Sequence, residues 1–204
     1  PCGVASGASL CEAYKKAFSC DTTSAFGGII ALNQIIDKDS AAEIIKIFTE
    51  VIIAPGITDE AKEIFESKSN LRILILPTLH EKSRSQNYKS IEGGILVQTN
   101  DSEETIKSDL KIVTQNKPSD HQIEDMLFAF KVCKHVKSNA IIYVKNKKTI
   151  GIGAGQMSRV DSAKIASQKN SQMDPSDENS LKDSVVASDA FFPFADGLLI
   201  TIES

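Results

Sequence analysis

The first half of the chain alternates amphipathic stretches with short apolar runs. Apolar residues recur at helical spacing between Leu10 and Phe18, directly after the capping-box pattern Ser9-Leu10-Cys11-Glu12, and predict a helix that ends near Ser19. Continuous apolar runs predict strands, and the mixed stretches between them predict helices. The predicted strands cover 29–32, 51–54 and 71–76, and the predicted helices open at Ser40 and span 58–68.

The second half predicts a long helix, a hairpin and a further helix. Residues 120–137 have helical periodicity, and two apolar runs flank Asn146-Lys147 as a tight hairpin turn. A helix over 160–168 and a polar loop over 170–180 follow. The last residues, 198–204, have the composition of the first turns of a helix.

A polar and basic segment, 81–100, connects the two halves, and within it only 93–97 predict a short strand. We therefore expect two lobes of one domain, over 1–118 and 119–204. Strands that alternate with helices predict a layered α/β fold with a largely parallel or mixed sheet. No internal repeat is evident in the sequence.

Composition narrows the classes of function. The formal charge of -4 and the pI of about 5.5 argue against a general nucleic-acid binder. No apolar run approaches the ~20 residues of a membrane span, and the start at Pro1 lacks the regions of a signal peptide. We expect a cytoplasmic protein with no nucleic-acid or membrane partner. Because the chain begins without Met and its last residues predict an unfinished helix, we expect both ends to be cut.

Four cysteines, Cys2, Cys11, Cys20 and Cys133, would suffice for two disulfides or a zinc site. Their spacing contains no C-x-x-C pair, and a cytoplasmic domain of this length needs no disulfide. We therefore expect free thiols and no bound metal.

The stretch Gly151-Ile152-Gly153-Ala154-Gly155-Gln156 is a glycine-rich turn between a predicted strand and a predicted helix. Such turns expose backbone N–H groups to a ligand, as nucleotide-binding loops do. However, Gln156 replaces the last glycine of the dinucleotide fingerprint, and no Walker-type Gly-Lys-Ser/Thr follows. On its glycines alone, the stretch is equally well explained as a tight turn.

Lys137-Ser138-Asn139-Ala140 lies where a helix gives way to a strand, a place where α/β proteins present ligand-binding side chains. An asparagine both donates and accepts, which suits recognition of a carboxamide. The alternative role for Asn139 is a helix C-cap.

Three phenylalanines surround Pro193 within 187–197. Core packing is the default for such a cluster, but proline fixes the backbone and the flanking Asp189 and Asp196 fit a core badly. The alternative is a flat apolar slot with polar edges, which would suit a pterin or purine ring.

Taken together and in order, segments along almost the whole chain resemble the 5-aminoimidazole-4-carboxamide ribonucleotide (AICAR) formyltransferase family. This domain forms the C-terminal half of bifunctional purine biosynthesis proteins, and the resemblance favours a bacterial member. The matching segments are Pro1-Cys2-Gly3-Val4-Ala5, 23–28, 51–55, 93–98, 137–140, 151–159 and 188–197.

The resemblance implies formyl transfer from the co-substrate 10-formyltetrahydrofolate to the exocyclic amine of AICAR. It implies a layered α/β/α, cytidine deaminase-like fold without catalytic zinc, and a homodimer with a shared active site. It places Asn139 at the catalytic centre, where it would hold the carboxamide beside the attacking amine. The implied nucleotide contacts are Gly27, Glu50 near the ribose, Lys68 near a phosphate, Arg159 and Phe191; the implied folate contacts are Phe26, Val160, Pro193, Phe194, Asp196 and Gly197.

The family carries a Lys-His pair directly before the Pro-Cys-Gly segment, and this histidine is the leading acid/base candidate. Since the chain begins at Pro1 and lacks the cyclohydrolase domain, we expect it to be inactive alone. None of its three histidines lies in a family motif. We expect His80 and His121 to be solvated, and His135 to be a surface or packing residue.

Two other functions stay open. A zinc nucleoside deaminase of the same general fold would need H/C-x-E and P-C-x-x-C ligands, which this sequence lacks. A non-catalytic nucleotide-binding or regulatory module would need only the binding surface.

Overall fold

The computed structural model describes residues 1–78, 86–173, 175 and 180–203, and these residues form three separate sheets. The elements are α1 (Leu10–Phe18), β1 (Gly28–Ala31), α2 (Lys38–Ile44), β2 (Thr49–Ala54), α3 (Asp59–Phe65), β3 (Arg72–Ile75), β4 (Gln86–Ile91), β5 (Gly94–Thr99), the 3-10 turn η1 (Lys107–Asp109), α4 (Asp120–Cys133), β6 (Ile141–Lys145), β7 (Lys148–Gly153), α5 (Arg159–Met173), β8 (Val185–Ser188) and α6 (Ala195–Glu203). The predicted α/β class is confirmed, although the strands do not form one continuous sheet.

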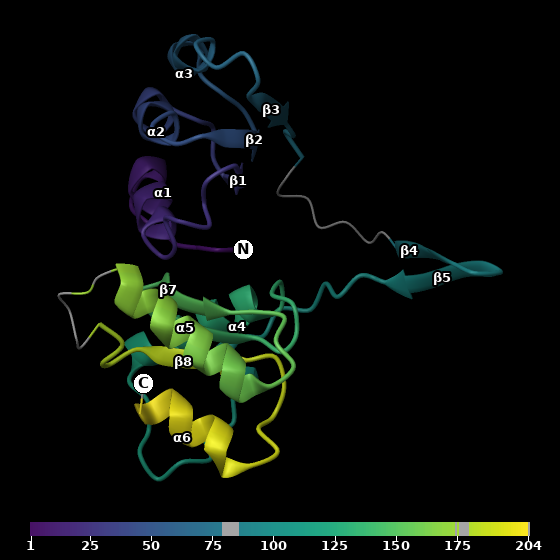
Figure 1. The fold of residues 1–204 in the computed structure, drawn as a ribbon, viewed down its shortest axis with the longest axis vertical. Helices are drawn as coiled ribbons and strands as arrows, with labels where there is room; N and C mark the ends of the chain where they lie inside the picture. The colour runs from purple at the N-terminus through teal and green to yellow at the C-terminus, as the bar shows by residue number, and fades with distance from the viewer. Residues whose placement is uncertain (79–85, 174, 176–179, 204) are drawn as a thin grey trace.

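The first sheet is parallel, with the strand order β1-β2-β3. Helices α1, α2 and α3 lie together on one side of it (Figure 1), over a core that includes Ile36, Ile52 and Phe65. On the strands, Ile29 is 72% exposed and Leu74 is 54% exposed. Since parallel sheets are normally covered on both faces, this apolar surface is unusual for a parallel sheet.

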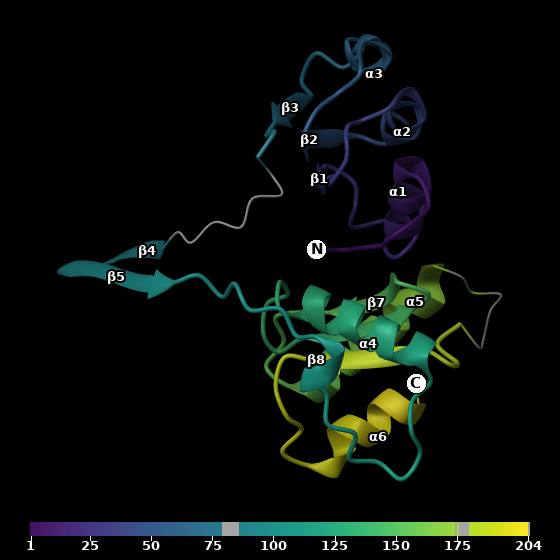
Figure 2. The same cartoon turned by 180° about the vertical axis from the view of Figure 1, so that it is seen from behind.

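The second three-stranded sheet is antiparallel, with the order β7-β6-β8. Helix α5 covers one face and α4 covers the opposite face, as the front and back views show (Figures 1 and 2). Successive side chains of β6 point to opposite faces of the sheet and so contribute to the core on both sides. Ile142 packs on the α4 side, while Ile141 and Tyr143 pack on the α5 side. This half therefore has the expected helix, sheet and helix layers.

The N-terminal segment joins the two halves. Val4 and Thr149 exchange hydrogen bonds, with the Val4 N–H 2.9 Å from Thr149 Oγ1 and the Thr149 N–H 2.9 Å from the Val4 carbonyl. This places the segment along the edge of β7. A Cβ on Gly3 would lie 2.0 Å from the Ala17 carbonyl at the end of α1, so only glycine permits this close approach.

The predicted hairpin turn between β6 and β7 is confirmed. Asn146 and Lys147 have φ values of 55° and 52°, the left-handed conformation that a type I′ turn requires. The carboxylate of Asp125 on α4, only 3% exposed, accepts the N–H groups of both residues at 2.8 and 2.7 Å. A buried side chain from α4 therefore stabilises a turn that contains no glycine.

Three predicted boundaries were wrong, and one strand was not predicted. The helix predicted over 120–137 ends at Cys133. Helix α2 begins at Lys38 rather than at Ser40, because Asp37 is its N-cap and accepts the Ser40 N–H at 2.7 Å. Helix α5 continues to Met173, into the first residues of the predicted loop 170–180, because Asn170 is buried and donates to the Ile150 carbonyl at 2.9 Å. Finally, 86–91 form β4.

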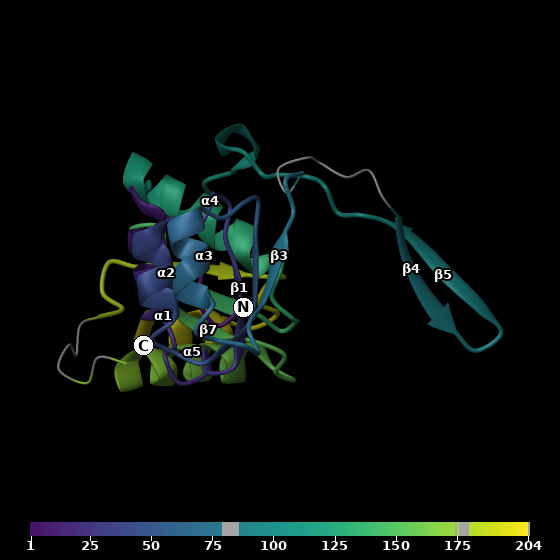
Figure 3. The ribbon, with the colours of Figure 1, turned by 90° about the horizontal axis from the view of Figure 1, so that it is seen from above.

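Strands β4 and β5 form an antiparallel hairpin that extends away from both three-stranded sheets (Figures 1 and 3). Every residue of the two strands is exposed, including Tyr88, Ile95 and Leu96. An isolated two-stranded hairpin is at best marginally stable in water. We therefore expect the apolar side chains of this hairpin to be buried against further protein. The predicted lobe boundary after 118 stays a prediction.

Within the described part of the chain, no helix is both long enough and apolar enough to cross a membrane.

Candidate functional site

The antiparallel order β7-β6-β8 brings three loops to one edge of the sheet. Strand β6 starts where β7 and β8 end, because its neighbours run in the opposite direction. Asn139 precedes β6, Arg159 begins α5 after β7, and Asp189 follows β8. Residues that are far apart in the sequence are therefore close together in the fold.

Asn139 is held by both its backbone and its side chain. Its N–H and its Nδ2 both donate to the Gln156 carbonyl, at 3.2 and 2.9 Å, and its own carbonyl accepts from Ser162 Oγ at 2.7 Å. Because a carbonyl can only accept, Nδ2 must face Gln156, and Oδ1 accepts no hydrogen bond from a described residue. The helix ends with its C-cap at Lys134, so the C-cap alternative for Asn139 is wrong.

The glycines of the 151–159 stretch mainly serve packing. A Cβ on Gly151 would lie 2.5 Å from the Ala166 carbonyl and one on Gly153 would lie 1.8 Å from the Ser162 carbonyl, so both glycines let α5 approach β7. Gly155 has a φ of +69°, and its N–H donates to the Lys137 carbonyl at 2.8 Å. The expectation that this turn offers its N–H groups to a ligand is therefore wrong for Gly155.

Asp189 connects the Asn139 loop to Arg159. Its Oδ1 accepts the Ala140 N–H at 3.2 Å and Arg159 Nη2 at 3.1 Å, while Arg159 Nε donates to Ser188 Oγ at 3.2 Å. Burial disfavours the Asp189 carboxylate, but hydrogen bonds from Ser138 and Ala140 and the charge of Arg159 outweigh it and lower the pKa of Asp189. The Asp189 carboxylate is therefore ionised at neutral pH.

The aromatic segment 187–197 divides into two environments. Phe192 packs on the core beside α5, and a Cβ on Gly197 would lie 2.4 Å from its ring. Phe191 and Phe194 are instead 79% and 74% exposed, and Pro193 and Asp196 are exposed as well. Core packing therefore holds for Phe192 only, and the exposed rings remain candidates for a ligand.

A second group of predicted residues lies at the N-terminal ends of the strands of the first sheet. Gly27, with a φ of +69°, donates its N–H to the Phe48 carbonyl at 2.9 Å, and the rings of Phe26 and Phe48 lie 5.4 Å apart. A Cβ on Gly27 would be 4.0 Å from Glu50 Oε1. Lys68 lines a cavity of about 220 Å³ together with Phe48.

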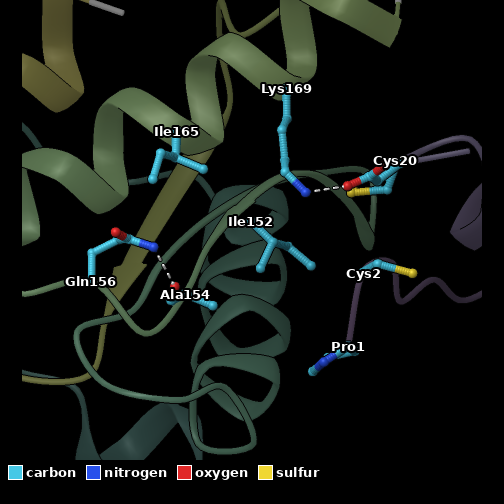
Figure 4. Close-up of a pocket in the computed structure, with 9 residues that line it drawn as sticks. Pro1, Cys2, Cys20, Ile152, Ala154, Gln156, Ile165 and Lys169 are labelled. Atoms are coloured by element: carbon cyan, nitrogen blue, oxygen red, sulfur yellow. Dashed lines mark hydrogen bonds and ion pairs between the residues drawn. The ribbon is translucent and has the colours of Figure 1, made fainter. Parts of the chain in front are cut away.

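A cavity of about 280 Å³ is lined by residues of the N-terminal segment, of the end of β7 with the turn that follows it, and of α5 (Figure 4). It is lined by Gln156, which holds Asn139, and by Asp21, which accepts the Ser24 N–H at 2.8 Å in the loop that leads to Phe26. Lys169 of α5 pairs with Asp21 and donates to Ser24 Oγ at 3.2 Å. In the described residues, no hydrogen bond or ion pair joins Gly27, Glu50 or Lys68 directly to the Asn139 group.

Among the remaining candidates, Cys2 and Cys20 line this cavity, whereas His121, His135 and Val160 do not. His121 and His135 are exposed on or just after α4, as expected, whereas His80 lies outside the described residues. Val160 is half-buried in the first turn of α5. All four cysteines are free, and the described residues contain no group of three or more His, Cys, Asp or Glu that could hold a metal ion.

Three contributors to the site were missed from the sequence. Phe48 pairs with Phe26, Ser162 fixes the Asn139 carbonyl, and Lys169 anchors the loop before β1. No local pattern marks them, because each acts on a residue distant in the sequence. For Asp189, the sequence indicated only that a charged residue fits a core badly, and it did not indicate the contact with Arg159.

These features define an α/β protein whose candidate site is built from side chains at a sheet edge rather than from a phosphate-binding loop. The sequence model of the AICARFT/IMPCHase bienzyme family matches residues 1–169. The chain belongs to this family.

Known relatives agree with the family match. The bifunctional purine biosynthesis protein PurH of Rhodospirillum rubrum is 56% identical over 203 residues, which is 98% of this chain and 39% of that protein. PurH of Ruegeria sp. is also 56% identical, over 98% of this chain and 38% of its own length. PurH of Parvibaculum lavamentivorans is 55% identical, over 100% of this chain and 39% of its own length. The chain therefore spans about 39% of the length of the curated relatives it matches.

Proposed function

We propose that the chain supplies part of the site that transfers a formyl group from 10-formyltetrahydrofolate to AICAR in purine biosynthesis. The observation that carries this proposal is the Asn139 side chain, whose Nδ2 is committed to Gln156 while Oδ1 accepts from no described residue. Through Asp189 the same segment is linked to the Arg159 guanidinium. Membership of the AICARFT/IMPCHase bienzyme family supports the assignment.

In the proposed reaction the AICAR amine attacks the formyl carbon, the bond from that carbon to N10 of the folate breaks, and the proton lost by the amine ends on N10. Asn139 Oδ1 would accept an N–H of the amine or carboxamide and fix the attacking nitrogen. A well-oriented contact of this kind lowers the barrier without itself taking the proton.

The other residues would bind the two substrates. Arg159 keeps its Nη1 amino group without a bond to a described residue, so it can donate to an oxygen of the nucleotide. The exposed rings of Phe191 and Phe194 suit stacking on flat heterocycles. We assign Gly27, Glu50 and Lys68 to the nucleotide side, and Phe26, Val160, Pro193, Phe194, Asp196 and Gly197 to the folate side; Gly197 would act by permitting the Phe192 packing.

We further propose that the protein works in the cytoplasm as a homodimer with a shared active site, without a metal. The exposed apolar side chains of β4, β5 and the first sheet support burial against further protein.

The test is to incubate the purified full-length protein with AICAR and 10-formyltetrahydrofolate and to follow formyl-AICAR by mass spectrometry, with and without a metal chelator. We expect chelator-insensitive turnover. Calorimetric binding of AICAR without turnover would support a non-catalytic module instead, and chelator-sensitive ammonia release would support a deaminase.

A further inference from the structure

Three segments of the candidate site meet at one carboxylate. Asp189 Oδ1 accepts the Ala140 N–H, next to Asn139, and the Nη2 of Arg159 at the start of α5. Asp189 also donates its own N–H to the Ala140 carbonyl at 3.4 Å, which extends the pairing of β6 with β8 by one residue. The exposed Phe191 follows two residues later in the sequence.

The same contacts fix the plane of the Arg159 guanidinium. Nη2 binds Asp189 and Nε binds Ser188 Oγ, so two neighbouring N–H groups are held by neighbouring residues. Ser188 Oγ is itself oriented, because it donates to the Ala190 carbonyl at 2.7 Å. An arginine held at two points loses most of the rotational freedom of its long side chain, and its Nη1 group then has one direction.

Burial makes the contact more effective than a surface ion pair. The side chains of Arg159 and Asp189 are each 17% exposed, so solvent screens their attraction less than at an open surface. Hydrogen bonds to Ala140 and Ser138 compensate for the partial burial of the carboxylate.

From this arrangement we infer that Asp189 is a positioning residue for the proposed formyl transfer, on which this inference rests. Its carboxylate holds Arg159 and the Asn139 loop in a single relative orientation, so that the nucleotide meets both side chains at once. Asp189 acts through these two residues and does not itself contact the substrate.

The test uses the full-length enzyme with Asp189→Asn, which keeps the size of the side chain and removes its charge. We expect kcat/KM for AICAR to fall about 10- to 100-fold, as for a misplaced catalytic group, while KM for 10-formyltetrahydrofolate stays unchanged. The double variant Asp189→Asn/Arg159→Ala should be no slower than Arg159→Ala alone, because both changes remove one interaction. Asp183→Asn, which removes an exposed charge shortly before β8, is the matched control and should behave as the wild type.

Other results in the same experiment would contradict the positioning role of Asp189. Losses that multiply in the double variant, KM values that rise equally for both substrates, or an Asp189→Asn protein that unfolds while Arg159→Ala stays folded would show a packing role and overturn the inference. If Asp189→Asn has normal kinetics and the wild type is active, the inference about Asp189 is wrong but the proposed function stands. A wild type that transfers no formyl group would overturn the proposed function as well.

Discussion

Phe192 and Phe194 lie two residues apart but have opposite environments, and this difference yields a quantitative prediction. Phe194 is 74% exposed, so about a quarter of a ~200 Å² side chain is buried, and Phe194→Ala should cost about 1 kcal/mol of stability at ~25 cal/mol per Å². Phe192 packs on the core against Gly197, so Phe192→Ala should cost about 3 kcal/mol or more, the range of a core phenylalanine truncation.

The assay compares thermal unfolding and substrate KM for the two variants in the full-length enzyme. Phe194→Ala should raise KM for 10-formyltetrahydrofolate by up to about tenfold, the value of one aromatic stacking contact, with a small change in melting temperature. Phe192→Ala should show the reverse, with a large loss of melting temperature. If Phe194→Ala destabilises the protein as much as Phe192→Ala and leaves the folate KM unchanged, the exposed ring has no ligand and the reasoning is wrong.

Two further predictions concern packing and thiol chemistry. Gly153→Ala should destabilise the protein by about 2 kcal/mol or more, since its Cβ would lie 1.8 Å from the Ser162 carbonyl. Gly94 has open space around it, so Gly94→Ala should have little effect. Equal melting temperatures for the two variants would contradict the packing role of Gly153. Burial raises the pKa of Cys20 and of Cys133 to about 11, so at pH 8 only ~0.1% of each thiol is ionised. Because the thiolate is the reactive form, mass spectrometry should find both cysteines unlabelled by iodoacetamide until the protein is unfolded. Labelling of the folded protein at the rate seen in denaturant would show that they are not buried.

Local signals in the sequence were enough to predict most helices and strands. The Asn146-Lys147 turn and the capped start of α1 are dictated by neighbouring residues, so they were predicted correctly. Strand β4 was missed because Tyr88 and Ile91 are its only large apolar residues, and an exposed hairpin needs no regular alternation. The end of α5 was missed because the buried Asn170 is stabilised by Ile150, a residue of β7.

The candidate site was predicted less completely, for a related reason. Asn139 and Arg159 belong to short motifs, so the sequence indicated them. The link between them depends on Asp189, which lies 30 residues from Arg159 and reaches it only because β8 pairs with β6. Likewise, Gly151 and Gly153 could not be assigned to helix packing until the approach of α5 was known.

The proposed role of Asn139 is to orient the reacting amine, and the kcat of Asn139→Ala in the full-length enzyme measures that role. Loss of an orienting hydrogen bond in a transition state costs about 3 kcal/mol, which corresponds to a fall in kcat of about 100-fold. We expect this fall with an unchanged melting temperature, and we expect normal kcat for Asn33→Ala, which changes an exposed asparagine. A folded Asn139→Ala enzyme with near-normal kcat would show that Asn139 does not orient the amine.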